Sequence, residues 1–101
     1  PHRYTRVQAL LTDFARAFYE ADVLAVTDIY PAGETPIPGV TAEGMARAIE
    51  EHGHKDVTLV KDIKDVPAWL KQRAREGDMV ITMGAGSVWR AGEEFLGLLK
   101  A

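Results

Sequence analysis

The sequence predicts an α/β domain built on a mainly parallel sheet with helices on both of its faces. Helical periodicity and short apolar runs alternate along the 101 residues in the order α-β-α-β-α-β-α. Such alternation makes the strands parallel, because each connecting helix crosses over one face of the sheet. Three strands are few for a sheet of this kind, and the chain opens on a helix where a strand should precede it. We therefore expect residues 1–101 to form one three-layer, Rossmann-like domain without its first strand, and to be a fragment of a longer protein.

The first predicted helix covers about residues 5–20, with Thr5 as its N-cap and Gln8 as the partner in a capping box. The segment 23–29 is almost continuously apolar, which is typical of a strand buried on both faces. Prolines and glycines between residues 30 and 39 exclude regular structure there. The residues expected on the buried face of the helix recur at helical spacing: Val7, Leu10, Leu11, Phe14 and Phe18.

A second helix is expected from its N-cap, Thr41, to about His52. Gly53 follows as the stop, because glycine readily adopts the left-handed conformation that ends helices. The next apolar run, 57–60, is predicted to be a strand. Two residues of the helix are expected to face the core: Met45 and Ile49.

Asp65 is predicted to open a third helix, since the first helical turn tolerates Pro67. Gly77 is expected to end this helix, and 79–83 is predicted to be the last strand. The residues expected on the buried face of the third helix are Val66, Trp69, Leu70 and Ala74.

Three unusual segments converge on one edge of the predicted sheet. In an open parallel sheet, ligands bind in the crevice beyond the carboxyl ends of the strands. Every loop from a strand into a helix lies at that edge, as does every helix N-terminus. Segments 2–6, 28–39 and 84–87 all have such positions, so the sequence predicts a ligand site there.

The turn Gly84-Ala85-Gly86 precedes a final helix that Ser87 is expected to cap and that runs to Leu99. Free N–H groups and the helix dipole at such a turn attract anions. The turn is not a P-loop, because the lysine after its second glycine is absent and the spacing differs. The same glycines also suit a tight strand-to-helix turn without a ligand, and that alternative stays open.

His2, Arg3 and Arg6 place an imidazole and two guanidinium groups at the start of the first helix. Cations there oppose the helix dipole, so the arrangement is locally unfavourable. A bound carboxylate or phosphate would relieve the conflict, because guanidinium groups bind such anions through paired hydrogen bonds. The alternative is that all three side chains are solvated near a frayed terminus.

The loop after the first predicted strand contributes Tyr30 and Glu34, and Asp28 ends that strand. A loop stiffened by proline is suited to form a pocket wall. The alternative is that Tyr30 packs against the protein while Glu34 lies in water. Asp28 fits equally well as a polar pocket residue and as the acceptor of a helix-cap hydrogen bond.

Composition narrows the classes of partner. A net charge of −3 and a pI near 5.5 argue against nucleic acid and against an anionic membrane. No apolar run approaches the ~20 residues of a membrane span, and the absence of cysteine agrees with a cytoplasmic location. No metal site is predicted. His52 and His54, beside Glu50 and Glu51, are interpreted as a solvated helix end.

The chain contains three distinctive motifs: Pro1-His2-Arg3-Tyr4-Thr5-Arg6, Ile29-Tyr30-Pro31-Ala32-Gly33-Glu34 with Pro36-Ile37-Pro38-Gly39, and Met83-Gly84-Ala85-Gly86-Ser87. These motifs are similar to those of the Mur ligases, and among these to the UDP-N-acetylmuramate–L-alanine ligases. The resemblance runs over essentially the whole chain and concerns the C-terminal domain of that family. The family's domain starts earlier than this chain, with a helix and a strand before His2.

The resemblance implies a ligase that uses ATP and Mg²⁺ to join L-alanine to UDP-N-acetylmuramate through an acyl phosphate, for peptidoglycan. ATP and Mg²⁺ would be bound mainly by the central and N-terminal domains of the same polypeptide, and the fragment alone would be inactive. By the same resemblance, Arg3 and Arg6 are catalytic and Ala85 lines the alanine pocket. With the residues of the sheet edge, the predicted substrate-binding set is His2, Arg3, Arg6, Tyr30, Glu34, Gly84, Ala85, Gly86 and Ser87.

Two alternative functions stay open. The chain could be a stand-alone α/β module that captures a small anion at the same edge, in which case it should bind phosphate or a carboxylate by itself. It could also belong to a neighbouring Mur ligase that adds a different amino acid or a peptide. The amino acid that stimulates ATP turnover would separate this case from the L-alanine ligase.

Overall fold

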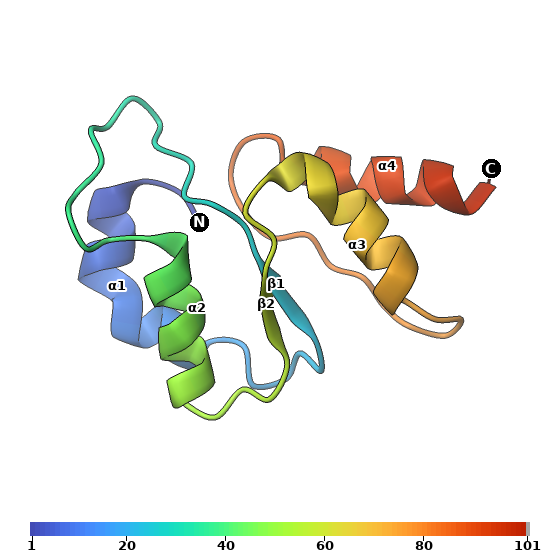
Figure 1. Cartoon of the computed structure of the whole chain (residues 1–101), viewed down its shortest axis with the longest axis horizontal. Coiled ribbons are helices and arrows are strands. Elements are labelled where there is room, and N and C mark those ends of the chain that lie inside the picture. Colours follow the sequence, from blue (N-terminus) through green and yellow to red (C-terminus); the bar gives the residue numbers. More distant parts are fainter. Residues whose placement is uncertain (101) are drawn as a thin grey trace.

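The computed structural model describes residues 1–100 as helices around a small parallel sheet. Figure 1 shows the two strands in the middle of the molecule, with the first two helices on one side and the last two on the other. The predicted α/β class is confirmed. In chain order, the elements are α1 (Tyr4–Arg16), β1 (Leu24–Val26), α2 (Ala42–Glu51), β2 (Val57–Leu59), the 3-10 turn η1 (Ile63–Asp65), α3 (Val66–Arg73) and α4 (Val88–Lys100).

The sheet consists of β1 and β2, which pair in parallel with Leu24 opposite Val57. Both strands are shorter than the apolar runs that predicted them. The pairing continues beyond the strands at their carboxyl ends, where the Val60 N–H donates to the Val26 carbonyl at 2.9 Å. The Asp28 N–H likewise donates to the Lys61 carbonyl at 3.1 Å. These bonds fix the residues that follow each strand side by side.

Each face of the sheet packs against its own pair of helices. On one face, Val26 and Ile29 join the inner sides of α1 and α2, where Ile49 is fully buried. On the other face, Ala25 and Val60 pack beneath α3 and α4. The near-continuous apolar character of the first strand follows from this, since both of its faces are covered. The predicted three-layer, Rossmann-like character of the domain stays a prediction.

The first helix differs from its prediction in three respects. It begins at Tyr4, so Thr5 is inside the first turn and is not the N-cap. It ends at Arg16 and is interrupted at Leu10, where the backbone angles are φ −115° and ψ 15°. Because of this break, Leu10 and Leu11 are each 36% exposed, while Val7 is buried and Phe14 and Phe18 pack against the core. Helical spacing alone could not reveal the break.

The second helix follows its prediction. The Thr41 hydroxyl oxygen accepts the Gly44 N–H at 3.0 Å, which satisfies one of the free donors of the first turn. Met45 and Ile49 are buried as expected. Gly53 has φ +101° just past the helix end, the left-handed conformation expected of a glycine stop.

The third helix begins after Asp65 with Pro67 in its first turn, as predicted, but it ends at Arg73 and not at Gly77. A local turn replaces the last helical residues. The Arg75 N–H donates to the Asp78 carboxylate at 2.8 Å, and the Asp78 N–H donates to the Arg75 carbonyl at 3.0 Å. This pair of bonds offers the backbone an alternative to the helix.

The third predicted strand, 79–83, is wrong. Within residues 1–100 this segment belongs to no strand and pairs with neither β1 nor β2. Met79 and Ile81 are 85% and 68% exposed. An apolar run favours burial, but a strand also needs a neighbouring strand with which to pair. In this structure α3 and α4 pack directly on each other. No helix in the described part of the chain is long and apolar enough to cross a membrane.

Candidate functional site

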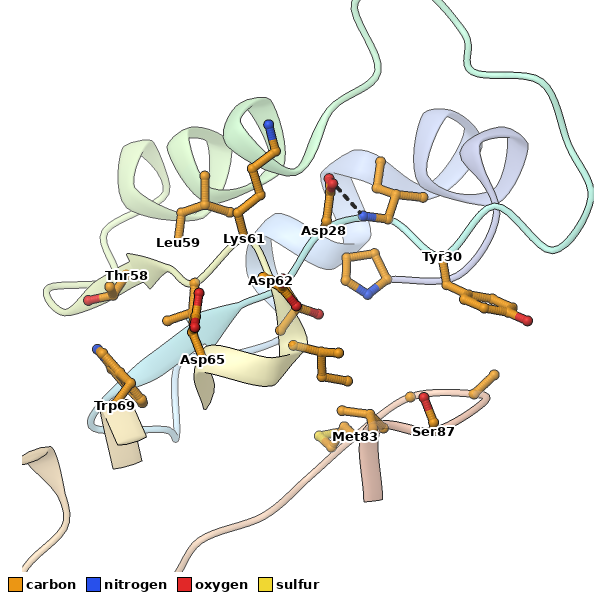
Figure 2. Close-up of a pocket in the computed structure, with 18 of the residues that line it drawn as sticks. Asp28, Tyr30, Thr58, Leu59, Lys61, Asp62, Asp65, Trp69, Met83 and Ser87 are labelled. Atoms are coloured by element: carbon orange, nitrogen blue, oxygen red, sulfur yellow. Dashed lines mark hydrogen bonds between the residues drawn. The ribbon is translucent and has the colours of Figure 1, made fainter. Parts of the chain in front are cut away.

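A groove of about 930 Å³ lies beyond the carboxyl ends of β1 and β2. Asp28 and Tyr30 border it on the segment that follows β1, and Lys61 borders it after β2. Figure 2 shows Tyr30 on one side of the groove, with Met83 and Ser87 across from it on the segment leading into α4. The groove is therefore at the sheet edge that chain order predicted for a ligand.

Two carboxylates in the groove already accept backbone hydrogen bonds. Asp28 Oδ1 accepts the Ile29 N–H at 3.1 Å, drawn as the dashed line in Figure 2. Asp62 Oδ1 accepts the Lys64 N–H at 2.9 Å and so caps η1. Asp28 is thus a pocket residue whose carboxylate is held by its neighbour's backbone and caps no helix. Trp69 and Gln72 of α3 also line the groove.

The glycine turn precedes α4 as predicted, and it needs both of its glycines. Gly84 has φ +146° and Gly86 has φ +80°, conformations that other residues rarely adopt. A Cβ at Gly84 would also lie 3.3 Å from a methyl group of Val88. Gly84, Ala85 and Ser87 line the groove, whereas Gly86 does not. The turn thus brings small residues to the same cavity as Tyr30.

The cations of the first segment do not line this groove. His2, Arg3 and Arg6 border a separate, shallower hollow of about 440 Å³, together with Thr5. The expectation that the arginines and the glycine turn share one cavity therefore does not hold in this conformation. Arg3 directly precedes α1 and Arg6 is in its first turn, and both residues are exposed.

Tyr30 connects the two hollows. Its ring stacks on the His2 imidazole, with centroids 5.5 Å apart and planes 15° from parallel, while Tyr30 also lines the groove. The backbones of the two residues form an isolated parallel bridge. The Arg3 N–H donates to the Tyr30 carbonyl at 2.7 Å, and the Tyr30 N–H donates to the Pro1 carbonyl at 2.9 Å. The alternative in which Tyr30 only packs is not met, because 54% of the residue is exposed.

Glu34 makes a second connection between the same two segments. Its Oε1 accepts the Thr5 N–H at 3.2 Å, and its Oε2 accepts the Thr5 hydroxyl at 2.6 Å. The Thr5 hydroxyl bond is the largest of the influences that lower the pKa of Glu34 below its usual value. A smaller lowering comes from the charge of Arg3. Glu34 lines neither hollow and is not free in water.

We call the residues joined by these bonds the N-terminal clamp: Pro1, His2, Arg3, Thr5, Tyr30 and Glu34. Sequence reasoning singled out most of its members but missed their pairing with one another. The available signal was the helix start, where cations stand without an acidic residue in the first turn. Such a start leaves free N–H groups that an acceptor from a distant part of the chain can satisfy.

The histidines near the end of α2 have structural roles. His54 is buried, its Nε2 lies 2.7 Å from the Ala21 carbonyl, and its Nδ1 accepts the Asp56 N–H at 3.2 Å. Its interpretation as solvated is therefore wrong. His52 is exposed, and its Nδ1 lies 2.8 Å from the Ala48 carbonyl of its own helix. Within residues 1–100, no three His, Asp or Glu side chains gather so that they could hold a metal ion.

The family model and the individual relatives that match the chain all describe Mur ligases. Residues 2–86 match the family model described as "Mur ligase, glutamate ligase domain". The chain is 55% identical over all of its length to a UDP-N-acetylmuramate–L-alanine ligase of Anaeromyxobacter sp. and 53% identical over 92% of its length to one of Trichlorobacter lovleyi. It is 50% identical over 99% of its length to one of Geobacter sulfurreducens. The matched regions are 22%, 20% and 22% of these relatives, so the chain spans about a fifth of their length.

Proposed function

Because the chain belongs to the Mur ligase family, we propose that it is the C-terminal domain of an ATP-dependent ligase that joins L-alanine to UDP-N-acetylmuramate. The family match and the names of its relatives support this assignment. In this proposal residues 1–101 are one domain of a three-domain cytoplasmic enzyme of peptidoglycan precursor synthesis. The central and N-terminal domains of the same polypeptide would hold UDP-N-acetylmuramate and most of the ATP.

One observation of the structure supports the proposal most directly. The groove at the carboxyl ends of β1 and β2 places exposed Tyr30 across from the small residues of the glycine turn. A wall of small residues on one side suits an amino acid with a one-carbon side chain. Gly84 and Ala85 would provide that wall, with Gly86 shaping the turn and Ser87 contributing a hydroxyl.

The proposed reaction has two chemical steps. The carboxylate of the sugar acid attacks the terminal phosphorus of ATP, which forms an acyl phosphate and releases ADP. The amine of L-alanine then attacks the acyl carbon, which forms the amide and releases phosphate, with the amine proton passing to solvent or a base. Arg3 and Arg6 would stabilise the negative charge on the transferred phosphoryl group, because guanidinium groups match its oxygens in pairs. His2 would lie beside them and contact the incoming amino acid.

Magnesium would offset phosphate charge when bound. Since no cluster within residues 1–100 provides a set of metal ligands, the proposal assigns the ion to the other domains. The residues of this chain would bind and orient, which is a large part of catalysis when two substrates must meet. They would do so on closure of the domain, and the chain alone would be inactive.

The full-length ligase tests this proposal. With ATP, Mg²⁺ and UDP-N-acetylmuramate, we expect phosphate release that depends on L-alanine, together with a product heavier by one alanine residue in mass spectrometry. Stimulation by D-glutamate and not by L-alanine would assign the chain to a neighbouring Mur ligase. If residues 1–101 alone bound phosphate or ATP tightly in calorimetry, a stand-alone anion-binding module would be the better description.

A further inference from the structure

We propose that Glu34 is a positioning residue, which caps α1 from the β1–α2 loop and thereby holds Arg3 and Arg6 in place. The predicted role of Glu34 was to contact the substrate. Both oxygens of its carboxylate instead accept hydrogen bonds from Thr5, 29 positions away in sequence. The inference rests on the proposed function insofar as it assigns the arginines to the reacting phosphate.

The start of α1 requires an acceptor that its own sequence does not supply. The residue before the helix is Arg3, which makes no side-chain cap, and the first turn contains no acidic residue. The free N–H groups and the dipole of this end therefore meet two cations and no anion. The carboxylate of Glu34 supplies that anion and satisfies the Thr5 N–H.

The backbone of Arg3 shows that the helix start is held against a local preference. Its φ is +65°, in the left-handed region that residues other than glycine rarely adopt. A conformation of this kind persists only where surrounding bonds determine it, and such residues cluster at functional sites. The Arg3 N–H donates to the Tyr30 carbonyl on one side, and the Thr5–Glu34 pair follows on the other. The backbone of Arg3 is thus fixed from both sides by one loop.

The hydroxyl of Thr5 helps to orient the carboxylate of Glu34. As a donor to Glu34 Oε2 at 2.6 Å, it forms a charge-assisted bond that holds the carboxylate at the start of α1. Glu34 does not line the groove that Tyr30 borders. A residue held in this way acts on a substrate only through the groups that it holds.

A double-mutant cycle in the full-length ligase tests the inference. Glu34→Gln keeps the shape of the side chain and removes its charge, and Thr5→Val keeps the shape of threonine and removes the hydroxyl. We expect each change to lower kcat/KM for the amino acid about tenfold, as for the loss of a hydrogen bond to a charged group. The double variant should be no worse than Glu34→Gln alone, because that change already disrupts the hydroxyl bond that Thr5→Val removes. Thr5→Ser should retain the wild-type value.

Glu93→Gln is the matched control, since Glu93 is exposed on α4 and forms no hydrogen bond or ion pair among the described residues. If Glu34→Gln loses activity while Thr5→Val does not, Glu34 does not act through its bond to the Thr5 hydroxyl and the inference is wrong. Unchanged kinetics in both variants would also overturn it. If Glu34→Gln does not fold, Thr5→Val and Thr5→Ser still decide between these outcomes. An enzyme that accepts another amino acid would defeat the proposed function only, because the cycle can be measured with that substrate.

Discussion

Two threonines show how position decides what a hydroxyl does at a helix start. Thr41 precedes α2, and its oxygen accepts the N–H of Gly44 within the same helix. Thr5 is inside α1, and its hydroxyl donates to the distant carboxylate of Glu34. The first arrangement is local and can be predicted from sequence. The second arrangement depends on the loop between β1 and α2, which is distant in sequence, so no local pattern reveals it.

Thr41→Ala should destabilise the chain by about 1 kcal/mol, because it leaves the Gly44 N–H without its acceptor. Urea unfolding followed by circular dichroism measures the loss. Thr35→Ala is the control, since Thr35 is exposed in the loop and its hydroxyl forms no hydrogen bond among the described residues. Equal midpoints for the two variants would contradict the cap.

The lowered pKa of Glu34 has a consequence for stability at low pH. A carboxyl whose pKa is lower in the folded chain stabilises the fold above its usual pKa, and this contribution disappears as the pH falls through the lowered value. Since the Thr5 hydroxyl is the main cause, Thr5→Val should raise the pKa of Glu34 toward its usual value. Carbon NMR of the Glu34 carboxyl during a pH titration measures the shift. Thr35→Val should leave the midpoint in place, and an unmoved midpoint in Thr5→Val would refute the assigned cause.

At the scale of elements, the sequence correctly predicts a helix whose start and end are marked by nearby residues. It fails for segments whose structure depends on contacts with distant parts of the chain. The cap, inner face and glycine stop of α2 are all readable, because each acts within a few residues. The early end of α3 could not be predicted in this way. It depends on a turn in which the Asp78 carboxylate accepts the Arg75 N–H, and this turn replaces the end of the helix. The segment 79–83 reads as a strand because its residues are apolar, but pairing with an edge is not a property of the segment.

A pair of isoleucines tests this difference between elements. Ile49→Ala on α2 should cost about 2–5 kcal/mol, because it opens a cavity in the core between α1, α2 and the sheet. Ile81→Ala should change the free energy of unfolding by less than about 0.5 kcal/mol, since Ile81 is 68% exposed. Urea unfolding of both variants gives the comparison. A large cost for Ile81→Ala would mean that 79–83 is buried against the free edge of β1.

The molecule as a whole consists of two small cores that share one thin sheet. The groove forms where the sheet ends, between the loop after β1 and the turn before α4. Chain order alone predicted that edge and the presence of Tyr30, Gly84, Ala85 and Ser87 along it. It did not predict that the arginines of α1 border a second hollow, because that depends on the clamp and on which way α1 points.

At the scale of the whole molecule, the proposed function is tested on the full-length protein. We expect Arg3→Ala and Arg6→Ala each to lower kcat about a hundredfold in the full-length enzyme, as for removal of a donor that stabilises developing charge. Arg47→Ala is the control, because Arg47 is exposed on α2 and borders neither hollow. Steady-state phosphate release measures all three. If both arginine variants retained wild-type kcat, the second hollow would have no part in the reaction.

The N-terminal clamp limits where the start of an expressed fragment can be placed. Residues 1–3 hold the β1–α2 loop through backbone hydrogen bonds. The Pro1 carbonyl accepts the Tyr30 N–H, and the Arg3 N–H donates to the Tyr30 carbonyl. A shortened clone that starts after Thr5 would leave the Tyr30 backbone and the Glu34 carboxylate without these partners. Such a clone would yield a protein with a loosened loop even though every residue of the loop is still encoded.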